Sequence, residues 1–492
     1  METKIGITDL LLISPVLAIF LASLFPIGIK VFRNNKSLNP IATVLWAFIG
    51  LASAMIINLS TLSIETTAFS GALVFDGVSS WSTIIIICIT TFALLLAKEN
   101  IATVAHQFEE FVFLILNASV GMILLSSSND LIVTFIAIEI MSLCLYMIIA
   151  LSREEKLSKE AAFKYFILGS FGSAIFLYGI AFVYGVGGTT YLNELTKVGA
   201  DLLTTNRLFV VGVVLTLIGF FFKVGLVPFH AWSPDVYEGS PTPVTAFMAA
   251  GVKVVTFAAI LRFVDLKVFS SGRSEDIVTF VQWVAVGSML LGNMAAILQD
   301  NLKRMLAYSS ISHSGYALMG VLAAGLGSDS LLGSTGTVFY IFAYSIMTIG
   351  TFGFVCLFEK REDTQLLVSD LKGLAVRNPW VALSMTIMLL SLAGIPPTIG
   401  FFGKFFVFTA AIEQGLIWLA VWGVISSIIS VYYYLRPIVY MYMKETDEQT
   451  MFVMPGKQLT AFSVGTMAFL IMLLGLFSEP VYNFVHQAVA KF

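Results

Sequence analysis

The chain is 492 residues long, and 58% of its residues are hydrophobic while only 12% are charged. Soluble globular proteins carry about 25% charged residues, so this composition argues against a water-soluble fold. The formal net charge of −3 provides neither a basic surface for nucleic acid nor an acidic tail, and nucleic-acid partners are therefore not expected.

In chain order, the sequence predicts an all-α polytopic membrane protein. Apolar stretches of about 18 to 25 residues, the length that crosses a bilayer as a helix, occur about fourteen times. The first is too long for a signal-peptide core and lacks a small-residue cleavage site, so we expect it to remain as a membrane helix. The predicted spans are 7-31, 39-60, 77-97, 109-128, 130-151, 161-185, 207-237, 241-263, 276-299, 302-325, 331-358, 379-412, 415-443 and 457-486.

Positive charge indicates the orientation in the membrane. Basic residues cluster after the first and after the fifth predicted helix, at Lys30, Arg33, Lys36, Arg153, Lys156 and Lys159. Because loops rich in Lys and Arg stay in the cytoplasm, we expect both termini on the outer side.

Two predicted helices, the seventh and the twelfth, are long and interrupted by proline. The interruptions are GLVPFHAWSP at 225-234 and AGIPPTIGFFG at 393-403. Proline inside a membrane helix frees the carbonyl four residues earlier. The carbonyls expected to be freed are that of Val224 by Pro228, and those of Leu392 and Ala393 by Pro396 and Pro397.

The spacing of these breaks predicts an internal repeat. They lie five helices apart, and asparagine-led openings, NDLIVTF at 129 and NLKRMLA at 301, precede them at the fifth and tenth helices. An odd number of helices per repeat makes the two repeats inverted. We expect helices 4 to 8 and 9 to 13 to form the repeats, giving units at 1-108, 109-263, 276-443 and 457-492.

The predicted spans contain few deep ionisable side chains. A lysine at a helix centre costs about 2.5 to 3.5 kcal/mol on insertion scales, so retained ones favour a function over a structural or snorkelling role. Lys164 lies close to its helix start, where snorkelling explains it equally well. The set is Glu139, Lys164, Lys223, Lys253 and Lys404.

The residue type is typical of proton exchange. Lysine, unlike arginine, can release its proton near neutral pH when it is taken out of water. Glu139 supplies a countercharge whose approach or withdrawal would load or discharge a lysine. Lys223 stands one turn before the Pro228 break, where the carbonyls of a half-helix end would favour its charged form. Lys404 follows its break by about two turns, so we expect the local electric field at its ammonium to differ from the field of the half-helix end expected at Lys223.

Two histidines are further candidates for a proton relay. His230 lies beside the first break and His313 lies inside the tenth helix, and each can also be a hydrogen-bonded core residue. Hydroxyl side chains accompany His313 and either hold water or allow close helix packing.

Cys88, Cys144 and Cys356 are expected to be buried small hydrophobes. No metal-ligand spacing, nucleotide-binding motif or nucleophile elbow occurs, so no catalytic or cofactor residue is assigned.

Several of these segments together resemble one family, the antiporter-like membrane subunits of proton-pumping NADH:quinone oxidoreductase, or respiratory complex I. The segment FFKVGLVPFHAWSPDVYEGSPTPVTAFMAAGVKVV at 221-255 is most similar to the subunit N version, the counterpart of mitochondrial subunit 2. Supporting segments are NDLIVTFIAIEIMSLCLYMIIAL (129-151), EAAFKYFILGSFGSAIFLYG (160-179), NLKRMLAYSSISHSGYALMG (301-320) and SLAGIPPTIGFFGKFFVF (391-408).

The resemblance implies fourteen helices with an inverted repeat, in a bacterial cytoplasmic (inner) membrane. It implies that Glu139 and Lys223 form a pair, that Lys253 is the central lysine, and that Lys404 leads to the outer exit. Flavin, iron-sulfur clusters and quinone would belong to partner subunits, and neighbouring antiporter-like subunits would be partners within the membrane arm. Two alternatives remain: a subunit of a multisubunit sodium/proton antiporter, and a structural membrane subunit that conducts nothing.

Overall fold

A computed structural model describes residues 6-33, 38-62, 64-101, 107-151, 156-271, 274-327, 331-358, 366-445 and 456-491. Within these ranges the chain is almost entirely helical, with one short hairpin of two antiparallel strands. The elements are α1 (Ile7–Phe32), α2 (Pro40–Thr61), β1 (Thr66–Ala68), β2 (Leu73–Phe75), α3 (Gly77–Asn100), α4 (Phe108–Ser127), α5 (Leu131–Ala150), α6 (Lys156–Gly187), α7 (Leu192–Thr205), α8 (Arg207–Val224), α9 (Trp232–Gly239), α10 (Thr242–Val264), α11 (Ser274–Ile297), α12 (Leu302–Leu326), α13 (Leu332–Phe358), the 3₁₀ helix η1 (Val368–Leu371), α14 (Leu374–Arg377), α15 (Pro379–Ala393), α16 (Ile399–Glu413), α17 (Ile417–Met443), α18 (Gln458–Leu476) and α19 (Ser478–Val489).

The helices account for the predicted membrane crossings. In the described ranges, 12 helices are long and apolar enough to span a bilayer, and one of them, α8, is continued after a break by α9. Two further crossings are α12, which carries more polar residues, and the interrupted pair α15 and α16. Helices suit the apolar interior of a membrane because they satisfy their own backbone hydrogen bonds. The prediction of an all-α membrane fold with about fourteen crossings is confirmed.

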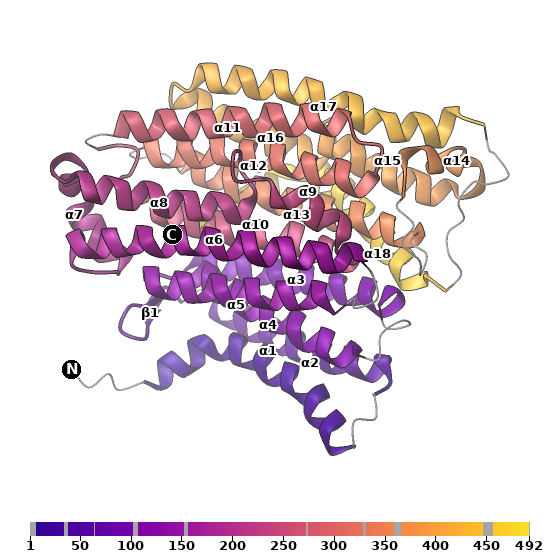
Figure 1. The fold of residues 1–492 in the computed structure, drawn as a ribbon, viewed down its shortest axis with the longest axis horizontal. Helices are drawn as coiled ribbons and strands as arrows, with labels where there is room; N and C mark the ends of the chain where they lie inside the picture. The colour runs from indigo at the N-terminus through magenta and orange to yellow at the C-terminus, as the bar shows by residue number, and fades with distance from the viewer. Residues whose placement is uncertain are drawn as a thin grey trace.

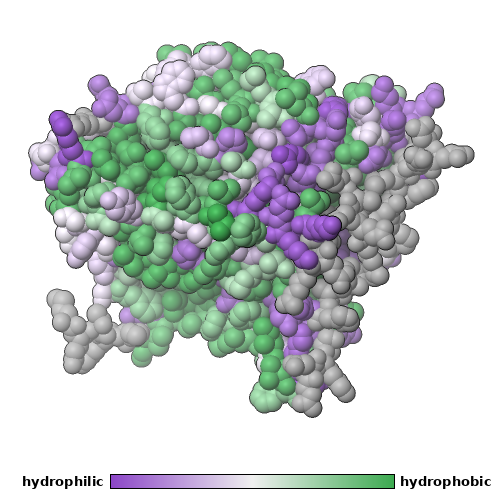
Figure 2. All heavy atoms as spheres, viewed as in Figure 1, coloured by the Kyte–Doolittle hydropathy of each residue, from purple (hydrophilic) through white to green (hydrophobic). Residues whose placement is uncertain are grey.

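Burial divides the bundle into a centre and a periphery. The apolar windows of α10 and α13 are 100% and 94% buried, whereas those of α1 and α2 are each 33% buried. Figure 1 shows α1 and α2 at one edge of the bundle and α17 at the opposite edge. Figure 2 shows apolar side chains over much of this face, with hydrophilic ones gathered near α7 and around α9. The most enclosed helices are therefore those between the two edges.

The two asparagine-led openings have the same backbone hydrogen bonds. At the start of α5, Leu131 N donates to Thr190 O at 3.0 Å, and Leu192 N donates to Asn129 O at 2.9 Å. At the start of α12 the same antiparallel pattern recurs, with Leu302 N to Leu366 O and Val368 N to Asp300 O, both at 2.9 Å. In Figure 1, α7 and α14, which follow these two pairings, lie at opposite ends of the molecule. This arrangement supports an inverted repeat, and we retain the units 109-263 and 276-443 as a proposal.

Both interrupted helices are present and end in the same way. Gly225 and Gly394 stop α8 and α15 in the left-handed conformation, with φ of 70° and 86°, which glycine adopts without a Cβ penalty. The amides of Leu226 and Ile395 then return to the carbonyls of Phe221 and Leu390, each at 3.0 Å. This is the Schellman pattern that closes a helix end.

Several local features were not predicted. The helix α7 and the β1–β2 hairpin lie between predicted spans, and the span predicted at 457-486 is divided at Phe477 into α18 and α19. Apolar length alone does not separate a short amphipathic helix from the end of a spanning one. The prediction for Cys88 was wrong because it lies exposed on α3, while Cys144 and Cys356 are buried.

Close contact between α6 and α8 yields a stability prediction. A Cβ at Gly179 would lie 2.6 Å from the backbone nitrogen of Thr216. Overpacking of this kind costs about 1–3 kcal/mol, so Gly179→Ala should lower the thermal midpoint of the purified assembled protein. Gly185→Ala on the same helix is the control, because a Cβ there meets no atom within 4 Å. Equal midpoints for the two variants would contradict the packing described here.

Candidate functional site

Glu139 and Lys223 lie together, joined by serine hydroxyls. Lys223 Nζ is 3.9 Å from Glu139 Oε1, and it donates to Ser142 Oγ at 3.1 Å and to Ser173 Oγ at 3.2 Å. The Ser173 hydroxyl in turn donates to Glu139 Oε1. The lysine side chain is 2% exposed and the glutamate 26% exposed. Helices α5, α6 and α8 thus place a countercharge beside a buried ammonium group, and Ser173 bridges the two.

Lys253 occupies the most enclosed helix, α10. It is buried, and its ammonium donates to Ser310 Oγ at 2.5 Å and also to the Ser310 carbonyl on α12. The ammonium also lies 4.8 Å from the centre of the Tyr344 ring on α13. A cation over an aromatic face gains electrostatic stabilisation, and this gain is larger when water is excluded.

His313 is the centre of a second hydroxyl cluster. Its Nδ1 lies 2.6 Å from the Tyr340 hydroxyl and its Nε2 lies 3.0 Å from the Tyr434 hydroxyl. Tyr434 also hydrogen-bonds to the hydroxyl of Ser309. Because both ring nitrogens have a hydroxyl partner, His313 is fully hydrogen-bonded and connects α12 to α13 and α17.

Lys404 turns back onto the helix break that precedes it. Its ammonium donates to the carbonyls of Leu392 at 3.0 Å and Ala393 at 2.9 Å, and to Ser427 Oγ at 2.9 Å. These are the two carbonyls that Pro396 and Pro397 were predicted to free. The expectation that Lys404 faces a different field from a half-helix end was wrong, because the break brings the end of α15 beside its side chain, which passes Gly394 to reach the two carbonyls.

The first break satisfies its freed carbonyl differently. The carbonyl of Val224, which Pro228 was predicted to free, accepts a hydrogen bond from Ser314 Oγ at 2.9 Å. The hydrogen-bond partners of Lys223 in the described residues are hydroxyls and not carbonyls of this helix end. We expected carbonyls of a half-helix end around the Lys223 ammonium, and the structure has such carbonyls around the Lys404 ammonium instead.

One segment of α12, residues 309-316, contacts Lys253, the first break and Lys404. Ser310 accepts from Lys253, Ser314 donates to Val224 at the first break, and the ammonium of Lys404 lies 5.1 Å from the Tyr316 ring centre. Ser314 also donates to the Ser310 carbonyl at 3.1 Å. The hydroxyl-rich stretch around His313 therefore connects both broken helices and the central lysine.

Lys164 and His230 lie apart from this core. Lys164 is 39% exposed and its ammonium is 2.7 Å from both Glu160 and Asp235. Arg304 pairs with the same Asp235 and with Glu238, also at 2.7 Å. Lys164 is thus part of a surface ion network, which agrees with snorkelling.

His230 belongs to the exposed side of the first break. Pro228 is exposed there, as are Pro396 and Pro397 at the second break. His230 Nδ1 is buried without a hydrogen-bond partner in the described residues. The structure does not bring His230 into contact with the lysine cluster.

Comparisons with known proteins identify the family. A profile described as "NADH:quinone oxidoreductase/Mrp antiporter, TM" matches residues 128–430. The chain is 48% identical to NADH-quinone oxidoreductase subunit N of Bdellovibrio bacteriovorus, over 99% of this chain and 100% of the relative. It is 35% identical to subunit N of Myxococcus xanthus, over 99% of both chains.

The chain belongs to the NADH-quinone oxidoreductase subunit N family. A chain of respiratory complex I from Thermus thermophilus superposes with a TM-score of 0.81 at 30% identity, covering 95% of this chain and 98% of that one. A chain of the Mrp complex from Dietzia sp. superposes with a TM-score of 0.82 at 22% identity, covering 98% of this chain and 97% of that one. The second likeness shows a shared fold alone.

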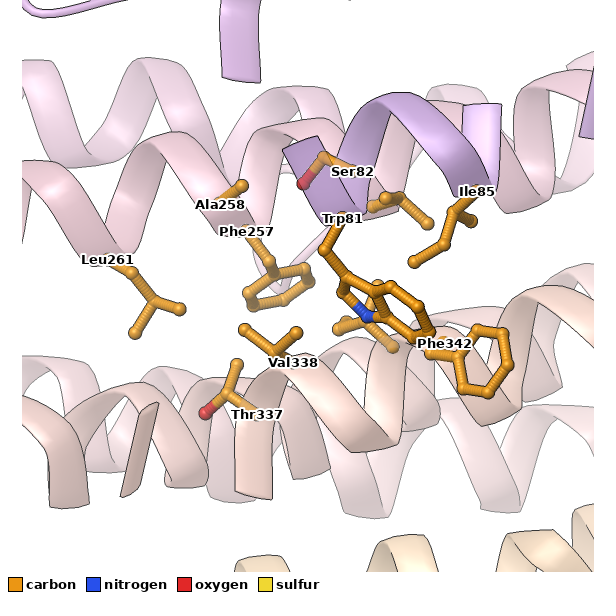
Figure 3. Close-up of a pocket in the computed structure, with 11 residues that line it drawn as sticks. Trp81, Ser82, Ile85, Phe257, Ala258, Leu261, Thr337, Val338 and Phe342 are labelled. Carbon is orange, nitrogen blue, oxygen red and sulfur yellow. The ribbon is translucent and has the colours of Figure 1, made fainter. Parts of the chain in front are cut away.

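A pocket in this subunit N family member lies away from the lysine cluster. Figure 3 shows it between α3, α10 and α13, with the Trp81 ring facing Phe342 and Val338. Its lining is mostly apolar and contains no ionisable side chain. We therefore place the candidate site at the buried lysines and His313, with their hydrogen-bond partners, and not at this pocket.

Sequence reasoning missed most of the polar partners of the subunit N lysines. Ser142, Ser173, Tyr344, Tyr434 and Ser427 each contact a predicted site residue. In the sequence these residues are visible as isolated hydroxyl side chains in strongly apolar helices. Such residues also allow close helix packing, so their presence alone does not indicate a site.

The Lys404 contacts yield a prediction for local stability. Lys404→Met removes the donor that bonds two carbonyls at the end of α15, and an unpaired buried polar group costs about 1–3 kcal/mol. Amides of residues 390-400 should therefore exchange faster with deuterated solvent in the assembled enzyme, measured by mass spectrometry. Lys223→Met is the control and should leave exchange at 390-400 unchanged. Unaltered exchange in Lys404→Met would show that the ammonium does not hold this break closed.

Proposed function

We propose that this chain is a proton-translocating subunit of the membrane arm of an NADH-quinone oxidoreductase. The observation that carries the proposal is a set of ionisable groups inside the bundle whose side chains hydrogen-bond to hydroxyls of α5, α6, α12, α13 and α17. We call this set the column, and its members are Glu139, Lys223, Lys253, His313 and Lys404. Isolated charges in a membrane interior are costly, and a sequence retains them where ions or protons move.

The Glu139–Lys223 pair supplies a means of loading and release. Two unit charges 4 Å apart attract by about 4 kcal/mol at an effective dielectric constant near 20. This attraction holds the proton on Lys223 while Glu139 is close. If the carboxylate withdraws, the buried ammonium loses that support and passes its proton onward. Glu139 lies at the partly exposed edge of the bundle, where a change in a neighbouring subunit can reach it.

Onward transfer uses side chains that both donate and accept protons. Serine and tyrosine hydroxyls and the two nitrogens of histidine have this property, whereas a lysine must release its proton before it can accept another. Ser310 at Lys253, and Tyr340 and Tyr434 at His313, provide such groups between the charged residues. We assign Lys253 to the middle of the path and Lys404 to its outer end.

The assembly and orientation follow from the same proposal. Other membrane-arm subunits, including neighbouring antiporter-like ones, are the partners. Both termini lie on the outer side of the bacterial inner membrane, consistent with the positive charges predicted to face the cytoplasm. Flavin, iron-sulfur clusters and quinone belong to partner subunits, because this sequence has no motif for binding them. We assign Lys164 and His230 no step on this path, since neither contacts the column among the described residues.

The proposal predicts that Lys223→Ala or Lys253→Ala lowers proton pumping by the assembled enzyme at least about tenfold, because removal of a proton-transfer group commonly costs that much or more. Membrane vesicles supplied with NADH and quinone would report quinone reduction and the pH gradient together. Lys197→Ala on the exposed side of α7 is the control, and native electrophoresis verifies assembly. If both lysine variants reduce quinone and build the gradient like the wild type, the chain is a structural subunit.

The same vesicles distinguish protons from sodium ions. We expect the gradient to be equal in sodium and in choline buffers, because the ammonium, imidazole and hydroxyl groups of the column can donate and accept protons. A gradient that requires sodium would favour the sodium/proton antiporter alternative.

A further inference from the structure

A buried tyrosine hydroxyl lies beside the Glu139–Lys223 pair without a partner. Tyr146 on α5 is 6% exposed, and its hydroxyl has no hydrogen-bond partner in the described residues. A buried hydroxyl without a partner costs about 1–3 kcal/mol, so proteins usually supply one, often an ordered water. The position of Tyr146 therefore indicates a site for a small polar molecule.

Tyr146 shares a helix face with the residues of the candidate site. At 100° per residue, Glu139, Ser142 and Tyr146 fall within about 60° of one another on α5. Ser142 accepts a hydrogen bond from Lys223 at 3.1 Å. A hydroxyl on this face is thus positioned to continue the hydrogen-bonded column along α5.

The neighbouring helix fixes the height of the Tyr146 hydroxyl. A Cβ at Gly169 of α6 would lie 2.0 Å from the Tyr146 oxygen, so the hydroxyl is level with Gly169. At 1.5 Å rise per residue, Ser173 is about 6 Å further along α6 and Lys164 about 7.5 Å in the opposite direction. The first separation is a rise between backbone levels along α6, and one water with two hydrogen bonds of about 2.8 Å can span a gap of that size.

The tyrosine ring is held in place on the side of the ion network. It packs edge-on against Tyr165, with ring centres 4.6 Å apart, and Tyr165 stacks on Trp232 at 4.7 Å. Tyr165 is adjacent in sequence to Lys164, whose ammonium pairs with Asp235. Tyr146 therefore lies between the Glu139–Lys223 pair and the surface ion pairs.

We propose that Tyr146 is a proton-transfer residue that delivers protons to Glu139 and Lys223 from the side of the Lys164–Asp235 ion pair. Its oxygen accepts a proton from a water on that side while its own hydroxyl proton passes to a water beside Ser173 or Ser142. One O–H bond forms and one breaks, the residue stays neutral, and rotation of the hydroxyl resets it. This step rests on the proposed function.

Two variants test the step from different sides. Tyr146→Phe removes only the hydroxyl and keeps the ring against Tyr165. Gly169→Ala leaves the tyrosine intact but places a methyl group where its hydroxyl lies. Both should lower the kcat of NADH-driven quinone reduction and the pumping rate about tenfold, less than the roughly 10²–10⁴-fold that general acid–base groups contribute, because water can partly replace a neutral relay.

The readouts separate proton transfer from structural damage. The KM for quinone should stay unchanged, and the solvent deuterium isotope effect on kcat should exceed that of the wild type, because a proton step becomes limiting. Tyr178→Phe and Gly185→Ala are the matched controls on α6, since Tyr178 is 60% exposed and a Cβ at Gly185 meets no atom within 4 Å. Both controls should behave like the wild type.

The outcomes are distinguishable from those of the lysine variants. Wild-type pumping in Tyr146→Phe together with a defective Lys223→Ala would overturn this step and leave the proposed function standing. A lowered kcat with an unchanged isotope effect would likewise overturn it, because the defect would then be structural. If Tyr146→Phe does not assemble, Gly169→Ala decides by the same readouts. Wild-type pumping in all of these variants, Lys223→Ala included, would refute the proposed function itself.

Discussion

Backbone carbonyls that a helix break frees inside a membrane must find donors within the protein, and much of this structure follows from that requirement. At the first break a serine of α12 bonds the freed carbonyl of Val224, and at the second an ammonium group bonds those of Leu392 and Ala393. Each break therefore relies on a polar side chain from another helical segment, Ser314 of α12 at the first and Lys404 of α16 at the second. In a bilayer interior this is the condition under which irregular backbone is tolerated.

The helix that supplies the donor at the first break also contacts two of the buried lysines. The stretch 309-316 of α12 donates a hydrogen bond to the first break, accepts one from the Lys253 ammonium and places the Tyr316 ring beside the Lys404 ammonium. A single helix thus links the two broken helices with the most enclosed helix, α10. A shift of α12 by a fraction of a turn would alter all of these contacts at once, whereas a shift of a peripheral helix such as α2 would alter none of them. This connection is the structural reason for treating separate lysines as one path.

Sequence reasoning predicted the parts of this arrangement that depend on local covalent structure. The lengths of the apolar stretches predicted the membrane-spanning helices. The positions of Pro228, Pro396 and Pro397 predicted which backbone carbonyls are freed. The pairing of Glu139 with Lys223 followed from the family resemblance and is present. The side chain of Lys404 points toward the N-terminus of its helix, as helical side chains generally do. What the sequence did not show is that the break folds so that the carbonyls of Leu392 and Ala393 lie within its reach.

Short amphipathic elements and hydroxyl partners were missed for other reasons. In the span predicted at 457-486, the residues of α19 are apolar enough to read as a continuation of α18. Ser173 and Tyr434 resemble ordinary packing residues until the distances to Glu139 and His313 are known. Whether such a hydroxyl belongs to a path depends on contacts between helices far apart in the sequence, which a single sequence does not contain.

In the proposed function, Glu139, Lys223, Lys253, His313 and Lys404 form one continuous path for protons. A cryo-electron-microscopy map of the assembled enzyme, at a resolution that shows ordered water, would reveal whether water connects these groups. We expect waters within hydrogen-bond distance, about 2.7–3.2 Å, that link each of these side chains or its hydroxyl partner to the next. A dry apolar gap between Lys223 and Lys253 in every state of the turning-over enzyme would contradict it.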